Sequence, residues 1–498
     1  MGACHSDAAI AATFIAYMVV VLVIGIAAWR RTEDLGDYIL GGRRLGPLVA
    51  ALSAGASDMS GWLLLGLPGL AYLSGQKALW LAGGLLAGTW LNWRIVATAL
   101  RQKSEAYGDS LTIPEYLERR FAQSRPAGGG LNAFAGPVLR AVSALFILFF
   151  FTIYTSSGLV AGGKLFSSVF GLPYLSAVLV GCSAIVAYTF LGGFLAVSWT
   201  DAFQALLMLA ALLIVPAMAL SQMVSGGDPG GSELISSIVS RAVSGEQLSV
   251  ISALSLAAWG LGYFGQPHIL ARFMALSSPE KAASARRIAT AWAALGMAAA
   301  ICAGIAGSAF FSQGLSDSEK VFIMLVKALL HPVPAGICLA GILAAIMSTA
   351  DSQLLVSSSA LTEDFYRRLI RPFASQKELV WVGRATVILV AAGAALLASD
   401  PESGVLDMVG YAWAGFGAGF GPVIVMSLFW NRMTGAGAAS GIVCGSLAVI
   451  AWRQLQGGIF DLYEIVPGIA AATAAVVLVS IAFPDRRGKE ADPDPYEE

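Results

Sequence analysis

The sequence is poor in charged residues. Only 12% of its 498 residues are Asp, Glu, Lys or Arg, and 57% are hydrophobic. Soluble domains carry about 25% charged residues, so half that share indicates an integral membrane protein. The long apolar stretches described below make the expected class an all-α integral membrane protein. The formal net charge is −1. We therefore expect no nucleic-acid partner, because a surface that binds nucleic acid carries an excess of Lys and Arg.

Histidine and cysteine are also scarce. The chain has three His and five Cys residues, and the Cys residues lie far apart, without the spacing of a metal site or a disulfide framework. No pairing of a nucleophile with a base and no phosphate-binding loop stands out. These absences argue against an enzyme and against a bound transition metal.

Long apolar stretches are abundant. About 20 apolar residues cross the bilayer core, and we count thirteen such stretches. They cover residues 9–29, 47–73, 78–100, 139–165, 173–192, 194–220, 249–273, 287–311, 333–361, 379–398, 405–430, 435–455 and 464–484. With the N-terminus outside, most Lys and Arg residues and the basic C-terminal tail lie inside, as the positive-inside rule requires.

The second stretch, 47–73, is interrupted by polar residues. Asp58 and Ser60 lie within it among small residues. A carboxylate at this depth is costly and is usually functional, although Asp58 could instead pair with a buried donor and help helices pack. Local unwinding would free the backbone carbonyls of Ala56 and Met59. Freed carbonyls can coordinate a small cation where they line an enclosed cavity.

The seventh stretch, 249–273, has a second interruption. Gly260, Gly262 and Gly265 weaken the helix, and Pro267 removes a backbone donor. Two interrupted spans in matching positions of two halves indicate a transporter whose binding site lies at the breaks.

The spans suggest two five-helix sets of opposite orientation, which is the inverted-repeat architecture. We therefore expect a first helix and inner loop (1–46), a first repeat (47–220), an outer loop with a second repeat (221–430), two peripheral helices (431–484) and a tail (485–498). We expect an outer loop over 223–248 and a short surface helix outside, over 318–331, from its apolar spacing. The polar tail is expected to be disordered.

Aromatic residues accompany both breaks. Trp259 and Tyr263 lie at the second break, Trp62 follows the first, and Tyr154 lies in the fourth stretch. Such rings can pack on a small ring and face a cationic nitrogen. They could equally be ordinary bundle core.

The ninth stretch supplies hydroxyl groups. Ser348 and Thr349 are adjacent, and Ala345 lies one turn earlier. A Ser or Thr in a membrane helix often bonds back to the preceding turn. Hard oxygen ligands with no His or Cys nearby instead suit an ion such as sodium.

Two further polar residues have open interpretations. Asp201, near the inner end of the sixth stretch, could guide a cation toward the cytoplasm or cap a helix. His268, beside Pro267, is expected to be a hydrogen-bonded structural residue.

Several runs are together typical of one family. They are Tyr38–Arg43, Ala51–Gly69, Ala258–Phe273 and Ala344–Asp364, with Gly192-Gly193-Phe194 as a further match. Over nearly its whole length the chain resembles the sodium/solute symporter family. The resemblance implies a leucine-transporter-type fold of about 13 helices with two inverted five-helix repeats. It also implies uptake of L-proline coupled to Na⁺ by alternating access, in a bacterial inner membrane with the N-terminus periplasmic and the C-terminus cytoplasmic. One Na⁺ for each proline is energetically sufficient.

The resemblance also assigns residues. It gives sodium ligands at the carbonyls of Ala56, Met59 and Ala345 and the hydroxyls of Ser348 and Thr349. It links Asp58, Ser60 and Gly61 to sodium and proline affinity, Trp62, Tyr154, Trp259, Tyr263 and Pro267 to the proline pocket, and Arg43 and Asp201 to coupling and release. The chain departs from the family at Asp351, where related sequences are uncharged. This carboxylate near the ion path puts a neutral five-oxygen sodium site in doubt.

Two alternatives stay open at this point. A symporter for another small zwitterion, such as a betaine, would have a similar pocket. A channel or a sensor could retain the fold, although a sensor would be expected to carry a fused signalling domain. The lipid bilayer is an implied partner, and the sequence does not indicate an oligomeric state.

Overall fold

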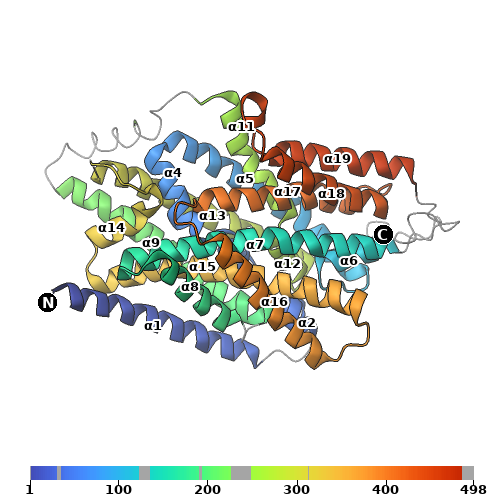
Figure 1. Ribbon diagram of the computed structural model, residues 1–498, viewed down its shortest axis with the longest axis horizontal. Helices are drawn as coiled ribbons and strands as arrows, with labels where there is room; N and C mark the ends of the chain where they lie inside the picture. Colours follow the sequence, from blue (N-terminus) through green and yellow to red (C-terminus); the bar gives the residue numbers. More distant parts are fainter. Residues whose placement is uncertain are drawn as a thin grey trace.

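The chain folds as a bundle of helices (Figure 1). The computed structural model describes residues 2–30, 35–122, 135–189, 193–225, 240, 248–311 and 313–484. The helices of the first half are α1 (Gly2–Trp29), α2 (Leu35–Leu40), η1 (Gly41–Arg43), α3 (Pro47–Asp58), η2 (Trp62–Gly66), α4 (Leu67–Leu73), α5 (Gly75–Ala106), α6 (Ile113–Ala122), α7 (Ala135–Phe170), α8 (Tyr174–Thr189) and α9 (Phe194–Ser225).

The second half of the chain is also helical. Its helices are α11 (Val250–Ala258), η4 (Trp259–Gly265), α12 (Pro267–Met274), η5 (Pro279–Lys281), α13 (Ala282–Phe310), η6 (Ser318–Lys320), α14 (Val321–Leu329), α15 (Pro332–Ser359), η7 (Ala360–Ile370), α16 (Gln376–Leu397), α17 (Val405–Phe429), α18 (Gly435–Trp452), η8 (Gly458–Asp461) and α19 (Ile465–Ala482). Named strands are absent from the described ranges.

All thirteen apolar stretches coincide with a helix or with a broken helix. Within the described residues, nine helices are long and apolar enough to span a membrane, or ten if the bent pair of α3 and α4 is one span. The count of about thirteen is consistent with this architecture, because α5, α8 and the α11–α12 segment account for the other stretches.

The first break separates α3 from α4. The two arms, Pro47–Asp58 and Trp62–Leu73, meet at a bend of 64°. The α-helix ends because Met59 takes a non-helical conformation (φ −86°, ψ 73°), and the chain re-enters a helix as the π-turn η2. The Ala56 carbonyl loses its helical partner, because the Ser60 amide donates to the Asp58 carbonyl instead.

The second break lies between α11 and α12. The tighter 3₁₀ segment η4 replaces an α-helical turn, and α12 restarts at Pro267 after Gln266 in an extended conformation. Glycines are needed here for close packing on α17. A Cβ at Gly262 would lie 1.9 Å from Trp413 Nε1, and one at Gly265 would lie 2.0 Å from the Phe416 carbonyl oxygen. The glycines that weaken the helix therefore also let it approach α17.

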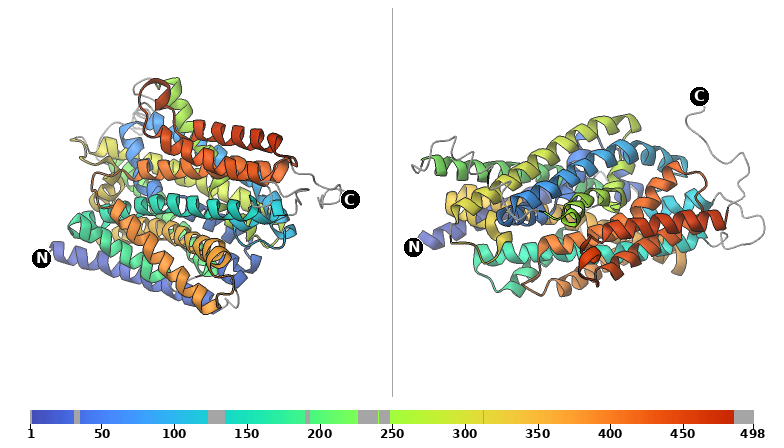
Figure 2. Two further views of the ribbon diagram at one scale, coloured as in Figure 1. Left: turned by 45° about the vertical axis from the view of Figure 1, so that its right-hand side comes forward. Right: turned by 90° about the horizontal axis from the view of Figure 1, so that it is seen from above.

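The bundle has a buried centre and two lipid-facing edges. The span that contains α15 is 83% buried and α17 is 78% buried, whereas α1 and α19 are each 28% buried. Figures 1 and 2 show α1 along one edge and α19 along the opposite edge. Both breaks lie beside the central helices, because α3 contacts α15 and η4 contacts α17.

The segment after α13 forms the short helix expected within residues 318–331. Residues Ser318–Lys320 form η6 and Val321–Leu329 form α14. Its apolar residues, among them Val321, Phe322 and Leu325, are buried against the bundle. In the expected loop over 223–248, α9 extends to Ser225 and most of the remainder lies outside the described residues, as does the tail 485–498.

Candidate functional site at the two helix breaks

Four of the five expected sodium ligands meet between α3 and α15. Ser348 Oγ donates to the Ala56 carbonyl at 2.9 Å and to the Ala345 carbonyl at 3.1 Å, and Thr349 Oγ1 donates to Ala56 at 3.3 Å. Met59, the fifth, is fully buried in the break. Ser348 thus bonds back within its helix and also reaches the broken helix. A role of these hydroxyls as sodium ligands stays a prediction.

The donor set suits a hard monovalent cation. The oxygens are neutral hydroxyls and carbonyls, which match the hard-ligand chemistry of alkali ions rather than that of transition metals. No cluster of three or more His, Cys, Asp and Glu side chains occurs in the described part of the chain. An ion here would contact both α3 and α15, and its binding would therefore depend on the break.

Asp58 lies at the centre of an aromatic cluster. Its Oδ2 accepts a hydrogen bond from Tyr263 Oη at 2.6 Å. Its backbone carbonyl accepts from Trp62 Nε1 at 3.0 Å and from Tyr154 Oη at 3.2 Å. Asp58 Oδ1 is buried and has no partner among the described residues. A buried oxygen without a donor is costly, and such groups in a membrane interior are usually retained for function.

Ser60 and Gly61 shape the break beside Asp58. Ser60 Oγ accepts from the backbone amide of Trp62 at 3.4 Å. Gly61 faces α7, and a Cβ there would lie 2.7 Å from the Cβ of Ala161. Any larger residue at this position would push the broken helix away from α7, which carries Tyr154.

The other two expected pocket residues lie apart from Asp58. Trp259 stacks on Tyr463, with ring centroids 5.3 Å apart, and borders a cavity of about 490 Å³ that Arg453 also lines. Pro267 begins α12 and borders a separate, narrow cavity. The structure therefore groups Trp62, Tyr154 and Tyr263, and it leaves Trp259 and Pro267 at the margins.

His268 is buried, as expected of a structural residue, but its ring lacks the expected hydrogen bond. The side chain is fully buried, and neither ring nitrogen has a hydrogen-bond partner within the described ranges. Its ring instead packs edge-on against Phe151 and Tyr154, with centroids 5.6 and 6.1 Å away. The prediction of a hydrogen-bonded histidine ring was therefore wrong. The polar contact of this residue with Arg272 is made by its backbone carbonyl.

Asp201 forms an ion pair rather than a helix cap. Its Oδ2 lies 3.0 Å from a guanidinium nitrogen of Arg272, and both side chains are fully buried. Ser53 Oγ and Ser57 Oγ also donate to Asp201 Oδ2, at 2.7 and 3.0 Å. Ser352 on α15 contacts both Arg272 and Ser57. This network ties α3, α9, α12 and α15 together about one turn away from the expected sodium ligands.

The sequence analysis missed Arg272. A signal was available, because an arginine lies inside the predicted span 249–273, and charges within membrane spans are functional by default. The partner of Arg272 could not be read from the sequence, because Asp201 lies 71 residues away on another helix.

Arg43 joins three segments of the chain at one end of the bundle. Its guanidinium pairs with Asp109 at 2.6 Å and donates to Ser104 Oγ, to the Ser110 carbonyl and to the carbonyl of Met274, the last residue of α12. Burial lowers the pKa of Arg43, and Asp109 opposes that shift. Arg43 is therefore hydrogen-bonded to the last residue of α12, the helix that carries Arg272.

Asp351 is fully buried on α15, two residues after Thr349. Its Oδ1 accepts from Thr189 Oγ1 at 2.6 Å, and its Oδ2 has no partner in the part of the chain that the structure describes. The departure noted in the sequence is thus a buried carboxylate with one available oxygen, one turn after Ser348 on α15.

Known transporters are similar to this chain over most of its length. The model of the sodium:solute symporter family matches residues 38–445. The sodium/proline symporter of Salmonella typhimurium (strain LT2) is 48% identical over 94% of this chain and 92% of its own length. The high-affinity proline transporter PutP of Bacillus subtilis (strain 168) is 47% identical over 92% of this chain and 95% of its own length.

A solved structure has the same fold. The Na⁺-coupled sialic acid symporter in its substrate-bound outward-open state superposes with a TM-score of 0.75, at 19% identity, over 95% of this chain and 98% of that chain. The expected class, an all-helical membrane protein with the leucine-transporter-type fold, is confirmed. The bacterial relatives and the apolar helices make this a multi-pass protein of the inner membrane, and a transporter rather than an enzyme. The chain belongs to the sodium:solute symporter family.

Proposed function

We propose that this chain imports L-proline by sodium-coupled secondary active transport with alternating access. The observation that carries the proposal is the pair of hydrogen bonds from Ser348 and Thr349 to the Ala56 carbonyl. They join the central helix to the broken helix two residues before Asp58. The 47–48% identical relatives named as proline transporters support the choice of substrate.

Sodium would replace these hydrogen bonds with coordination. Five neutral oxygens would coordinate the ion, from Ser348, Thr349, Ala56, Ala345 and Met59. The bound ion would hold α3 against α15. Because Asp58 is the last residue of α3, fixing α3 also fixes the carboxylate and its aromatic neighbours. Proline would then bind more tightly to the sodium-loaded protein, and proline would raise sodium affinity by the same factor.

The substrate pocket lies at Asp58. Asp58 Oδ1 is available for the cationic nitrogen of proline, and the Tyr154, Tyr263 and Trp62 rings would surround the pyrrolidine ring. The substrate carboxylate would meet unpaired backbone amides at the start of a half-helix. Ser60 and Gly61 would keep the break open for this pocket, and Trp259 and Pro267 would act on it from the margins, through η4 and the start of α12.

Arg43, Asp201 and Asp351 would act in coupling and release. The Arg272–Asp201 pair holds α12 to α9 beside the ion site, so opening toward the cytoplasm would require this network to rearrange. Asp351 would add negative charge on the path of the departing ion. The N-terminus would be periplasmic and the C-terminus cytoplasmic, with repeats over 47–220 and 221–430.

A stoichiometry of one sodium for each proline suffices for uptake. One charge crossing ~100 mV contributes ~2.3 kcal/mol, and a tenfold sodium gradient contributes ~1.4 kcal/mol. Together they support accumulation of roughly several hundred-fold.

The test is labelled proline uptake into sealed vesicles that contain the purified chain. An inward sodium gradient should drive accumulation above the external concentration, and collapse of the gradient should release it. Excess betaine should leave uptake unchanged, while proline analogues should compete. Inhibition by betaine with none by proline analogues would assign the site to another zwitterion. Sodium currents without proline, far above turnover rates, would indicate a channel.

A further inference from the structure

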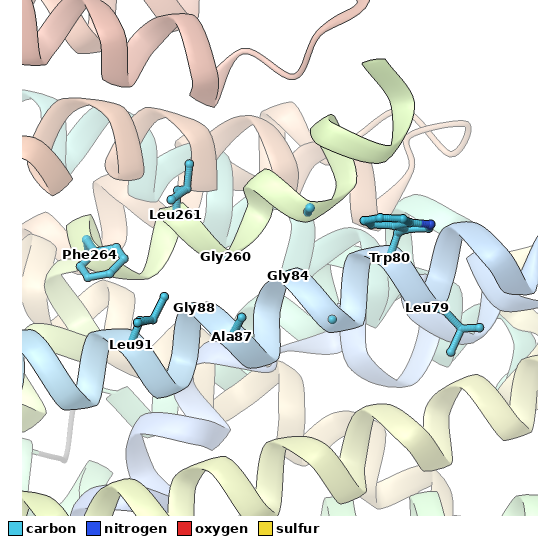
Figure 3. Close-up of a pocket in the computed structure, with 11 residues that line it drawn as sticks. Leu79, Trp80, Gly84, Ala87, Gly88, Leu91, Gly260, Leu261 and Phe264 are labelled. Atoms are coloured by element: carbon cyan, nitrogen blue, oxygen red, sulfur yellow. The ribbon is translucent and has the colours of Figure 1, made fainter. Parts of the chain in front are cut away.

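The lipid-facing side of η4 borders an apolar groove that the transport site does not use. One cavity of about 450 Å³ lies between α5 and the α11–η4 segment, and a second of about 320 Å³ extends toward α17 and α19. Leu261 and Phe264 line both cavities, so the two form one continuous groove. Figure 3 shows Leu261 and Phe264 on η4, beside the part of α5 that carries Ala87 and Leu91, with the Leu261 side chain directed away from α5.

The floor of this groove is a direct backbone contact. A Cβ at Gly88 would lie 2.2 Å from the Gly260 carbonyl oxygen, and a Cβ at Gly84 would lie 2.3 Å from the Ala257 carbonyl oxygen. Gly83, one residue earlier, lines the groove and meets no atom within 4 Å. The floor is therefore tightly packed, while the space above Gly83 is open to the membrane.

An exposed arginine lies at one end of the groove. Arg94 is three residues after Leu91, so it lies on the same side of α5, and it directly precedes Ile95, which lines the second cavity. Arg94 is exposed, and no hydrogen bond or ion pair joins it to another described residue. A second guanidinium, of Arg286, lies over the ring of Trp90, one turn before Arg94.

We propose that this groove binds an anionic phospholipid of the inner leaflet, with its phosphate on Arg94 and one acyl chain along Leu91, Ala87 and Gly83. From Arg94 to Gly83 is eleven residues, or about 16 Å of helix, which is half of the ~30 Å hydrocarbon core. Arginine is the side chain that best recognises phosphate. An anionic lipid is favoured because a zwitterionic lipid brings its own ammonium group, whereas Arg94 and Arg286 have no carboxylate partner among the described residues.

The lipid would act on the transport site through η4. Leu261 and Phe264 face the groove, and Tyr263, between them in sequence, turns the other way to bind Asp58. An acyl chain against Leu261 and Phe264 would hold η4 on α5 and thereby keep Tyr263 in place. The leaflet assignment and this effect depend on the proposed function, whereas lipid binding itself does not.

The binding test is native mass spectrometry of the chain purified from membranes that contain phosphatidylglycerol. The unchanged chain should retain phosphatidylglycerol. Arg94→Gln should reduce the retained fraction about fivefold, the factor typical of one basic residue at a membrane surface. The matched control is Lys377→Gln, an exposed cation at the start of α16, which should retain the lipid.

A second variant tests the acyl-chain path. Gly83→Leu would fill the open space without displacing protein atoms, and it should also lower retention. Ala392→Leu places the same bulk at an exposed position of α16 and should not. Equal retention by Arg94→Gln, Gly83→Leu and the unchanged chain would overturn the proposal. A dimer that Gly83→Leu dissociates, with lipid retention unchanged, would assign the groove to a second copy of the chain.

Uptake gives an independent readout. Sodium-driven uptake should be faster in vesicles of phosphatidylcholine mixed with phosphatidylglycerol than in phosphatidylcholine alone, and Arg94→Gln should lose this difference. If lipid is retained but proline is not transported by any variant, the proposed function fails and the lipid site stands. If proline is transported equally in both vesicles and no lipid is retained, the lipid site fails and the function stands.

Discussion

The Arg272 guanidinium and the Asp201 carboxylate form a fully buried ion pair inside the membrane bundle, 3.0 Å apart. Their helices, α12 and α9, belong to different halves of the chain, and serines of α3 and α15 complete the network. Removing one partner of a buried pair leaves an uncompensated charge, which is more costly than removing both.

Arg272→Gln should destabilise the folded protein by about 3–5 kcal/mol and abolish uptake, because Asp201 would be left unpaired. The double variant Arg272→Gln with Asp201→Asn should recover thermal stability relative to Arg272→Gln. The measurement is Tm in detergent together with vesicle uptake. A double variant that is as unstable as the single one would show that the pair does not act as a unit.

Ser348→Ala and Thr349→Ala should each raise the sodium concentration for half-maximal uptake by about tenfold, the effect of losing roughly 1.4 kcal/mol of ion binding. The protein should still insert, because each change removes only one hydroxyl. Ser143→Ala is a matched control, since Ser143 donates to Leu139 within α7. If the sodium dependence of uptake is unchanged in both variants, α15 is not part of the ion site.

Tyr263→Phe should weaken proline binding more than Trp259→Ala does. Tyr263 donates directly to Asp58, and its loss leaves a second buried carboxylate oxygen unpaired, which costs about 1–3 kcal/mol. Trp259 stacks on Tyr463 away from Asp58, so its loss should weaken proline binding less and largely spare sodium binding. Equilibrium binding of labelled proline at saturating sodium measures both. A larger effect of Trp259→Ala would instead place the proline pocket at the cavity that Trp259 and Arg453 line.

Asp351→Asn should raise the half-saturating sodium concentration by roughly fivefold, about 1 kcal/mol, because it removes a negative charge near the ion ligands. Thr189→Val keeps that charge and removes only its hydrogen-bond donor, so its effect should be smaller. Uptake measured across sodium concentrations compares the two. An unchanged sodium dependence in Asp351→Asn would exclude this carboxylate from the ion path.

The helix breaks could be predicted from local chemistry. Pro267 lacks a backbone donor, and glycines such as Gly262 weaken a helix wherever they stand, so both features are visible in the sequence. Asp58 and the Ser348–Thr349 pair were recognisable because polar groups are rare and costly within apolar spans.

Tertiary relationships could not be predicted in the same way. The partner of Arg272 depends on how α9 packs against α12, which no spacing in either segment encodes. Trp259 and Tyr263 are separated by one turn, yet only Tyr263 meets Asp58, because the 3₁₀ geometry of η4 and its contact with α17 set their directions. His268 was misjudged because its ring packs among aromatic side chains.

Coupling between sodium and proline can be measured by equilibrium binding of proline to the purified chain across sodium concentrations, with the reciprocal titration of sodium at fixed proline. Sodium should lower the Kd of proline, proline should lower the Kd of sodium by the same factor, and Ser348→Ala should shift both titrations. A proline Kd that is independent of sodium would contradict this coupling.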